Sequence, residues 1–185
     1  MIDFYKKCLH TMLRLAHARG FTHIGSSLSA MLSLAYLFRR YYPFASSSVN
    51  GQIALRQFGY PKLILSKGHA VPALYACLIA RGAVAFERVA DGFSSEFEFE
   101  HPTIGLESVI TPTGSLGHGL GVGCGIAEAQ LRKGVVAPVF VILGDGEVNE
   151  GSVWESAIYA GARKLGALIA FIDFNGWQAT GRSTD

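Results

Sequence analysis

The spacing of apolar residues along the chain predicts alternating helices and strands. Apolar side chains recur every three to four residues over 4–19, and residues 27–40 and 71–81 carry similar helical patterns. Residues 63–65, 139–143 and 167–173 are instead short apolar runs that predict strands. The run 139–143 is rich in branched residues, which suits a strand buried on both faces of a sheet. The polar stretch 43–60 is predicted to be a loop. The periodicity fades over 86–111, which predicts a loop-rich excursion over one edge of the sheet.

The last third of the chain predicts a parallel βαβ unit. Strand 139–143 is followed by a helix over 152–164, with Ser152 placed to cap it and Gly166 to end it, and then by strand 167–173. We therefore predict an α/β fold with three α/β/α layers and a mainly parallel sheet. We expect a single domain over residues 1–185, with the fold incomplete at its C-terminus.

Two oxygen-bearing side chains follow the strands of this unit. Asp145 stands between Gly144 and Gly146 at the end of the first strand, and Asn175 comes just past the end of the second. Both emerge at the carboxyl edge of the sheet, where ligands bind in open α/β folds. Carboxylate and amide oxygens suit Mg²⁺ or Ca²⁺, and the glycines let the backbone approach a diphosphate closely. Alternatively, the glycines form a plain turn and Asn175 is a loop residue.

Composition limits the classes of function. Half of the residues are hydrophobic and 16% are charged, which is apolar for a soluble monomer and suggests apolar surface buried against a partner. A net charge of +2 without a basic cluster gives no reason to expect nucleic acid. No apolar run reaches the roughly 18 residues of a membrane span. The three cysteines lack a CxxC spacing and are expected to be buried free thiols, so we expect a cytoplasmic protein.

A glycine-dense segment, 113–121, precedes a predicted helix over 122–131. Its backbone N–H groups could cradle a phosphate. Its glycines could equally allow close helix packing at an interface, and both interpretations can hold together. The segment contains neither G-x-G-x-x-G nor G-x-x-x-x-G-K-[ST], so a dinucleotide fingerprint is unsupported.

Several histidines lie beside glycine or proline at the ends of predicted elements. His23, His69 and His101 share this placement, and His118 in the glycine-dense segment is a fourth candidate. Each alone is commonly a structural residue, but together they predict a cluster that titrates near neutral pH. Glu150 lies at the start of the predicted helix 152–164, where the helix dipole favours a carboxylate.

Taken together, these segments resemble the N-terminal, diphosphate-binding domain of transketolases. The resemblance runs through most of the chain in the order of the family. The segments that carry it are His23-Ile24-Gly25-Ser26-Ser27-Leu28, Leu65-Ser66-Lys67-Gly68-His69, His101-Pro102, Thr113-Gly114-Ser115-Leu116-Gly117-His118-Gly119, Gly144-Asp145-Gly146, Glu150-Gly151 and Asn175-Gly176.

The resemblance implies thiamine diphosphate as cofactor, with Mg²⁺ or Ca²⁺ bridging its diphosphate. Asp145, Asn175 and the backbone carbonyl of Trp177 would bind the metal ion. Gly144 and Gly146 would lie at the diphosphate, with the N–H of Gly146 contacting a phosphate.

The remaining roles concern the reactive end of the cofactor. Gly114 and Leu116 would approach the aminopyrimidine through their backbone. His69 and His101 would lie near the thiazolium and the substrate, with His23 as a proton-transfer or oxyanion partner. Glu150 would join a carboxylate network that connects active sites across a dimer.

The resemblance also implies a partner. In this family a second domain receives the pyrimidine and supplies the carboxylate that activates the cofactor, and we expect a C-terminal, pyrimidine-binding transketolase subunit in a homo- or hetero-oligomer. The chain is either one subunit of a split enzyme or a shortened product. Alone, we expect it to bind cofactor weakly at best and to turn over nothing.

The expected activity is transfer of a two-carbon ketol unit between sugar phosphates or to a related acceptor. A decarboxylating or xylulose-phosphate-forming relative is the alternative within the same superfamily. A non-catalytic assembly subunit that keeps the fold is the alternative from another class.

Overall fold

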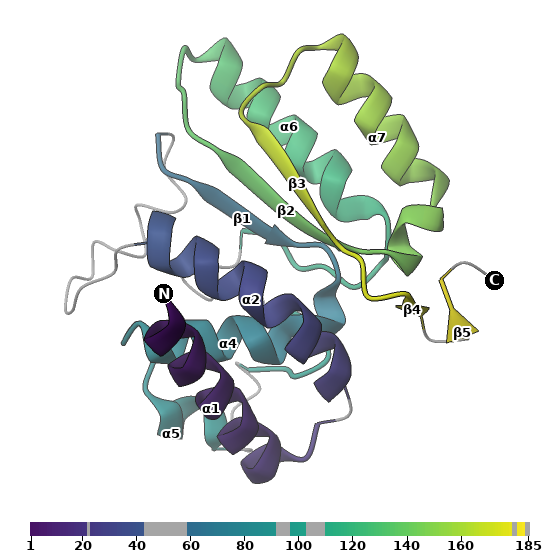
Figure 1. Ribbon diagram of the computed structural model, residues 1–185. Coiled ribbons are helices and arrows are strands. Elements are labelled where there is room, and N and C mark those ends of the chain that lie inside the picture. The colour runs from purple at the N-terminus through teal and green to yellow at the C-terminus, as the bar shows by residue number, and fades with distance from the viewer. Residues whose placement is uncertain (22, 43–58, 92–96, 103–109, 179–180, 184–185) are drawn as a thin grey trace.

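The computed structural model describes residues 1–21, 23–42, 59–91, 97–102, 110–178 and 181–183 (Figure 1). Most of the predicted loop 43–60 and parts of the excursion 86–111 lie outside these residues. Within them, no helix is both long and apolar enough to cross a membrane.

Three parallel strands form the central sheet. They are β1 (Lys62–Leu65), β2 (Val139–Gly144) and β3 (Leu168–Asp173), in the order β1-β2-β3. Strand β2 is buried along its whole length, as its continuous apolar sequence predicts. The register places Gly144 of β2 beside Asp173 of β3, so the residues that follow the two strands emerge together.

Helices cover both faces of the sheet (Figure 1). One face carries α1 (Ile2–Arg19), α2 (Ile24–Tyr41) and α4 (Val71–Ala80), and the other carries α6 (His118–Arg132) and α7 (Gly151–Ala162). Shorter elements complete the described chain: η1 (Gly68–Ala70), α5 (Phe86–Ala90), η2 (Gly146–Asn149), β4 (Trp177–Gln178) and β5 (Gly181–Arg182).

Alternating side chains of β2 join two separate apolar cores. Phe140 and Ile142 pack in the cluster formed with α1, α2 and α4. Val141 and Leu143 point the other way and pack with Leu120 of α6. This alternation follows from the two-residue repeat of a strand. The predicted three-layer α/β fold with a parallel sheet is confirmed.

The predicted helix boundaries need correction. Helix α6 starts at His118 rather than at 122, and the region 86–111 contains the short helix α5. Helix α7 starts at Gly151, so Ser152 does not cap it; the Ser152 hydroxyl instead donates to the Gly117 carbonyl at 3.0 Å. The helix ends before Lys164, which adopts φ 53°, and not at Gly166.

Candidate functional site at the carboxyl edge of the sheet

The Gly144-Asp145-Gly146 turn and the Asn175 loop meet where β2 and β3 end. The Gly176 N–H donates to Asp145 Oδ2 at 2.7 Å, and the Asp145 N–H donates to the Asp173 carbonyl at 3.3 Å. A Cβ at Gly146 would lie 2.7 Å from Cβ of Gln178, so β4 packs directly over the turn. The parallel unit therefore brings the predicted pair Asp145 and Asn175 to one place.

Asp145 is a buried carboxylate that pairs with no cation in the described part of the chain. Its side chain is 6% exposed, and its partners are the Gly176 N–H and the Ser183 hydroxyl, the latter at 2.6 Å. Burial by itself would raise the pKa of Asp145, but hydrogen bonds from Ser183 and Gly176 outweigh it and hold the pKa below its usual value. The carboxylate is therefore ionised at neutral pH and is available to a positive ligand.

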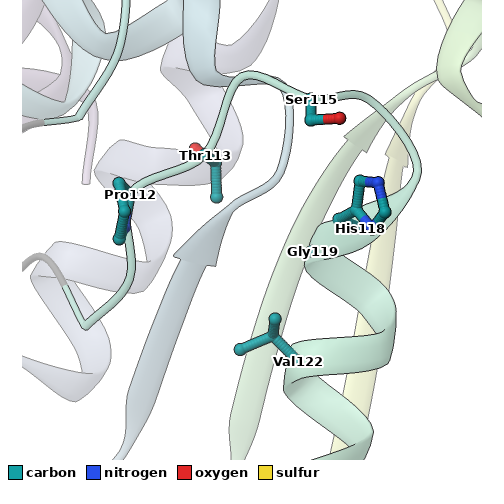
Figure 2. Close-up of a pocket in the computed structure, with 6 residues that line it drawn as sticks. All are labelled: Pro112, Thr113, Ser115, His118, Gly119 and Val122. Atoms are coloured by element: carbon teal, nitrogen blue, oxygen red, sulfur yellow. The ribbon is translucent and has the colours of Figure 1, made fainter.

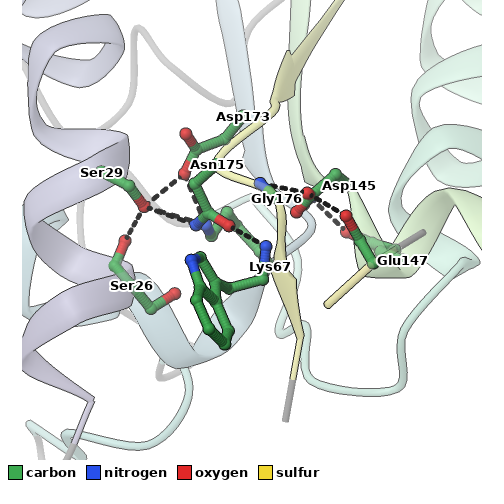
Figure 3. A network of polar contacts seen from close by, with 11 residues as sticks. Ser26, Ser29, Lys67, Asp145, Glu147, Asp173, Asn175 and Gly176 are labelled. Carbon is green, nitrogen blue, oxygen red and sulfur yellow. Dashed lines mark hydrogen bonds and ion pairs between the residues drawn. The ribbon is translucent and has the colours of Figure 1, made fainter. Parts of the chain in front are cut away.

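Asn175 is exposed at the same edge, and its amide is oriented by two neighbours. Asn175 Nδ2 donates to Ser29 Oγ at 3.3 Å, and Asn175 Oδ1 accepts from the Trp177 N–H at 2.8 Å (Figure 3). Trp177 begins β4, and its side chain is exposed. The amide oxygen thus faces the start of the β4–β5 hairpin.

The predicted histidine cluster forms around His69. The rings of His23 and His69 lie 5.5 Å apart between centroids. Burial lowers the pKa of His69 to about 4, with Lys67, His23 and His101 acting in the same direction and Asp173 opposing them. The prediction that the cluster titrates near neutral pH is therefore wrong for His69, which is neutral at pH 7.

His101 joins the cluster through the glycine-dense segment. A Cβ at Gly114 would overlap the His101 ring, so this position needs a glycine, and its φ of 145° also favours one. Leu116 is 38% exposed two residues further on. The segment therefore brings its backbone beside the histidines.

The end of the glycine-dense segment lies against the start of α7. A Cβ at Gly117 would lie 2.7 Å from Cβ of Glu150, the residue that precedes α7. Glu150 itself is exposed. Ser115 and His118, on either side of Gly117, line a small cavity of about 170 Å³ (Figure 2).

Sequence reasoning missed two charged groups at this edge. Lys67, 2% exposed, pairs with Asp173 through Nζ and Oδ2 at 2.6 Å. Glu147, also 2% exposed, accepts hydrogen bonds from the Gly117 N–H at 2.9 Å, the Gly144 N–H at 3.1 Å and the Ser66 hydroxyl. A sequence signal existed, because Asp173 ends an apolar run, and Lys67 and Glu147 lie two and four residues after such runs.

The donor set for a metal ion is small. In the described segments, no three His, Cys, Asp or Glu side chains gather closely enough to hold an ion. The predicted set uses one such side chain, Asp145, with an amide oxygen and a backbone carbonyl. These are hard oxygen donors that suit Mg²⁺ or Ca²⁺ when phosphate oxygens complete the shell.

Comparison with known families and proteins gives a consistent result. Residues 19–185 match the family described as transketolase, thiamine diphosphate binding domain. The chain is 36% identical over 171 residues to the 6-deoxy-6-sulfo-D-fructose transketolase subunit SqwG of Clostridium sp. (strain MSTE9), covering 88% of this chain and 58% of that protein. It is 35% identical over 168 residues to a subunit of the apulose-4-phosphate transketolase of Phocaeicola vulgatus, covering 88% and 56%. The chain thus spans somewhat more than half the length of these relatives.

Solved structures show the same fold. A transketolase variant from Pichia stipitis in complex with xylulose-5-phosphate matches with a TM-score of 0.81 and 25% sequence identity. The match covers 98% of this chain and 28% of that chain. A second structure of the Pichia stipitis enzyme, in complex with sedoheptulose-7-phosphate, gives the same values.

Proposed function

We propose, from the premise that this chain belongs to the transketolase family, that it forms one diphosphate-binding domain over residues 1–185. This domain serves as the diphosphate-binding subunit of a split, thiamine-diphosphate-dependent enzyme. The enzyme transfers a two-carbon ketol unit between sugar phosphates or to a related acceptor. One observation carries the proposal: Asp145 is a buried carboxylate with no cationic partner in the described residues, and it meets the Asn175 loop at the carboxyl edge.

The residues present fit a divalent cation with a diphosphate. Asp145 and the Asn175 amide oxygen supply hard oxygen donors, and the carbonyl of Trp177 is the third donor we assign. We assign Gly144 and Gly146 to the diphosphate, with Gly146 contacting it through its N–H. Gln178 of β4 lies against Gly146 in the structure, so a phosphate bound there has to move β4. Repeating the binding assay below with Ca²⁺ in place of Mg²⁺ distinguishes the two ions.

The bound cofactor supplies the electron sink for cleavage of a carbon–carbon bond. The protein's own part is binding and proton handling. His69, neutral at pH 7 because its pKa is about 4, accepts or donates a hydrogen bond without adding charge. We assign His101 and His23 to the substrate side of the same cluster, and Gly114 and Leu116 to backbone contacts with the cofactor's pyrimidine.

A partner protein is part of the proposal. Both relatives are named as subunits, and we assign to this chain, as its partner, a C-terminal, pyrimidine-binding transketolase subunit. Exposed apolar side chains support an extended interface: Trp154 and Ile158 on α7 and Ile172 on β3 are 59%, 72% and 53% exposed. Glu150, beside the start of α7, lies where a carboxylate can reach such an interface.

The substrate class follows from the relatives' names. One name specifies 6-deoxy-6-sulfo-D-fructose and the other apulose-4-phosphate, so we propose an anionic sugar as the substrate. An assay that offers sugar phosphates and a sulfo-sugar in parallel, with pyruvate as the decarboxylation alternative, distinguishes the reaction classes.

Calorimetry with thiamine diphosphate and Mg²⁺ tests the proposal. The chain is titrated alone and with its co-expressed partner, and Asp145→Asn is compared with Glu155→Gln, an exposed carboxylate on α7. We expect binding that tightens with the partner, falls at least about tenfold in Asp145→Asn and is unchanged in Glu155→Gln. Absence of binding with the partner, or equal binding by Asp145→Asn, would overturn the proposal in favour of a non-catalytic assembly role.

A further inference from the structure

A buried ion pair bridges the carboxyl ends of two strands that are not neighbours. Lys67 follows β1 and Asp173 ends β3, with β2 between them, yet Lys67 Nζ lies 2.6 Å from Asp173 Oδ2. The lysine side chain reaches Asp173 by crossing the end of β2. A Cβ at Gly144 would lie 3.9 to 4.0 Å from Cβ, Cδ and Cε of Lys67. The bridge therefore passes over the first glycine of the Gly144-Asp145-Gly146 turn.

Three carboxylates gather at this edge, and they differ in what compensates their charge. Asp145 and Glu147 accept hydrogen bonds from neutral hydroxyl and N–H groups. Asp173 alone of the three pairs with a cation within the described residues. Without the Lys67 ammonium, a third uncompensated carboxylate would lie beside a site that has to accept a diphosphate.

The Asn175 amide is linked to the same pair through Ser29. The Ser29 hydroxyl donates to Asp173 Oδ2 at 2.6 Å, which is nearer than its other acceptor, the Ser26 carbonyl, at 3.0 Å. Ser29 Oγ is then an acceptor for Asn175 Nδ2 at 3.3 Å. With Nδ2 turned toward Ser29, the Asn175 oxygen points away from it. The Trp177 N–H, which donates to Asn175 Oδ1 at 2.8 Å, holds the same orientation from the other side and does so without Lys67.

We propose that Lys67 is a positioning residue that acts through Asp173, whose charge it offsets so that the edge accepts a diphosphate. The inference rests on the proposed function, which places a divalent cation and a diphosphate at this edge. Removing the ammonium acts on the two ligands with opposite sign, because added negative charge attracts a cation and repels a diphosphate. A residue that merely holds the fold together would weaken both ligands in parallel.

Calorimetry on four variants in the presence of the partner protein tests this. Lys67→Met removes the charge and keeps the length of the side chain, and Lys67→Arg keeps the charge. Asp173→Asn and the double variant Lys67→Met/Asp173→Asn remove the charge that Lys67 compensates. Lys62→Met is the matched control, because Lys62 is also buried, 4% exposed, at the opposite end of the same strand. Each protein is titrated with Mn²⁺ alone and with thiamine diphosphate in excess Mg²⁺.

For Lys67→Met at low salt, we expect Mn²⁺ to bind about threefold tighter and thiamine diphosphate about tenfold weaker. The double variant should return both affinities nearly to the wild-type values, since the charge is again balanced. Lys67→Arg should lie nearer the wild type, and Lys62→Met should change neither affinity. Asp173→Asn leaves the ammonium unpaired, so Mn²⁺ should bind more weakly and thiamine diphosphate at least as tightly. This variant therefore tests the inference even if Lys67→Met fails to fold.

Parallel losses of both ligands in Lys67→Met, without recovery in the double variant, would overturn the inference and leave the proposed function standing. Unchanged affinities in Lys67→Met and Asp173→Asn would do the same. A wild-type protein that binds neither Mn²⁺ nor thiamine diphosphate would overturn the proposed function itself, and the inference with it.

Discussion

Removing the Glu147 carboxylate should destabilise the protein strongly, although Glu147 carries no partner of opposite charge in the described residues. The side chain is 2% exposed and serves three donors from three segments: the Ser66 hydroxyl after β1, the Gly117 N–H before α6 and the Gly144 N–H at the end of β2. Each donor is itself buried, so water does not replace the lost acceptor. Glu147 therefore joins the segments that build the carboxyl edge.

The magnitude follows from the number of stranded donors. A buried donor without an acceptor costs about 1–3 kcal/mol, so the loss of an acceptor for three donors in Glu147→Ala should lower the free energy of unfolding by roughly 3–9 kcal/mol. Glu147→Gln keeps one acceptor oxygen but turns an NH₂ group toward a backbone N–H, which strands one donor and should cost about 1.5–3 kcal/mol. Such losses are a large fraction of the 5–15 kcal/mol that is typical of a whole domain, about 10 kcal/mol at the centre of that range.

Urea unfolding of the ligand-free protein, followed by circular dichroism, measures these differences. Glu155→Gln on the exposed face of α7 is the control and should stay within about 0.5 kcal/mol of the wild type. The informative result is the ranking of the losses in unfolding free energy, which should be largest for Glu147→Ala, smaller for Glu147→Gln and smallest for Glu155→Gln. If Glu147→Ala loses less than about 1 kcal/mol, the three hydrogen bonds do not hold this edge together and the reasoning is refuted.

Three further predictions follow from single contacts. Gly123→Ala would place a Cβ 2.7 Å from Val141 Cγ2 and should lose about 1–3 kcal/mol of stability, whereas Gly125→Ala meets open space and should gain about 0.5–1 kcal/mol; effects of the same sign in urea unfolding would contradict this. His69 has a pKa of about 4 in the fold and about 6.5 when unfolded, so its contribution to stability is complete above pH 6.5 and is lost as the pH falls toward 4. Unfolding of His69→Asn measured over this range should show a shallower pH dependence than the wild type, and equal slopes would count against the buried, neutral imidazole. Ser183→Ala removes the hydroxyl that donates to Asp145 Oδ2, and should raise the affinity for Mn²⁺ about threefold in calorimetry; a weaker affinity would show that the hydroxyl does not compete with the ion.

The layers of the fold and the edge that holds the site could be predicted from sequence. Residues 139–143 are a branched apolar run that suits a strand covered by helices on both faces, and β2 is buried along its whole length. Residues 167–173 are also an apolar run and form a strand, but β3 is only partly buried. Once these two strands are parallel, the residues after them have to emerge at the same edge. Asp145 and the Asn175 loop meet there, joined by the Gly176 N–H.

The start of α6 could not be predicted, because its glycines oppose a helix locally. Glycine costs about 1 kcal/mol relative to alanine within a helix. Tertiary packing overrides this: a Cβ at Gly119 would overlap Ser66, and a Cβ at Gly123 would press on Val141. The glycines let the helix lie close to β1 and β2, a benefit that appears after the strands are in place.

The pKa of His69 was beyond sequence reasoning for a similar reason. Its position after β1 predicted a place at the edge, and the contact with His23 agrees with that. The burial that lowers its pKa depends on how η1 packs under α2, and the nearby Lys67 ammonium adds to the effect. Neither quantity is encoded in the local pattern around His69.

The distribution of partners among the three carboxylates identifies which one can serve a cation. Glu147 is committed to three donors within the scaffold, and Asp173 is committed to Lys67 and Ser29. Asp145 takes its hydrogen bonds instead from Gly176 and Ser183, at the two ends of the hairpin that follows Asn175. These donors are neutral, so a divalent cation can displace them. Binding of an ion at Asp145 therefore has to change the contacts of the β4–β5 hairpin, and the residue that accepts the ion also governs the loop that carries Asn175 and Trp177.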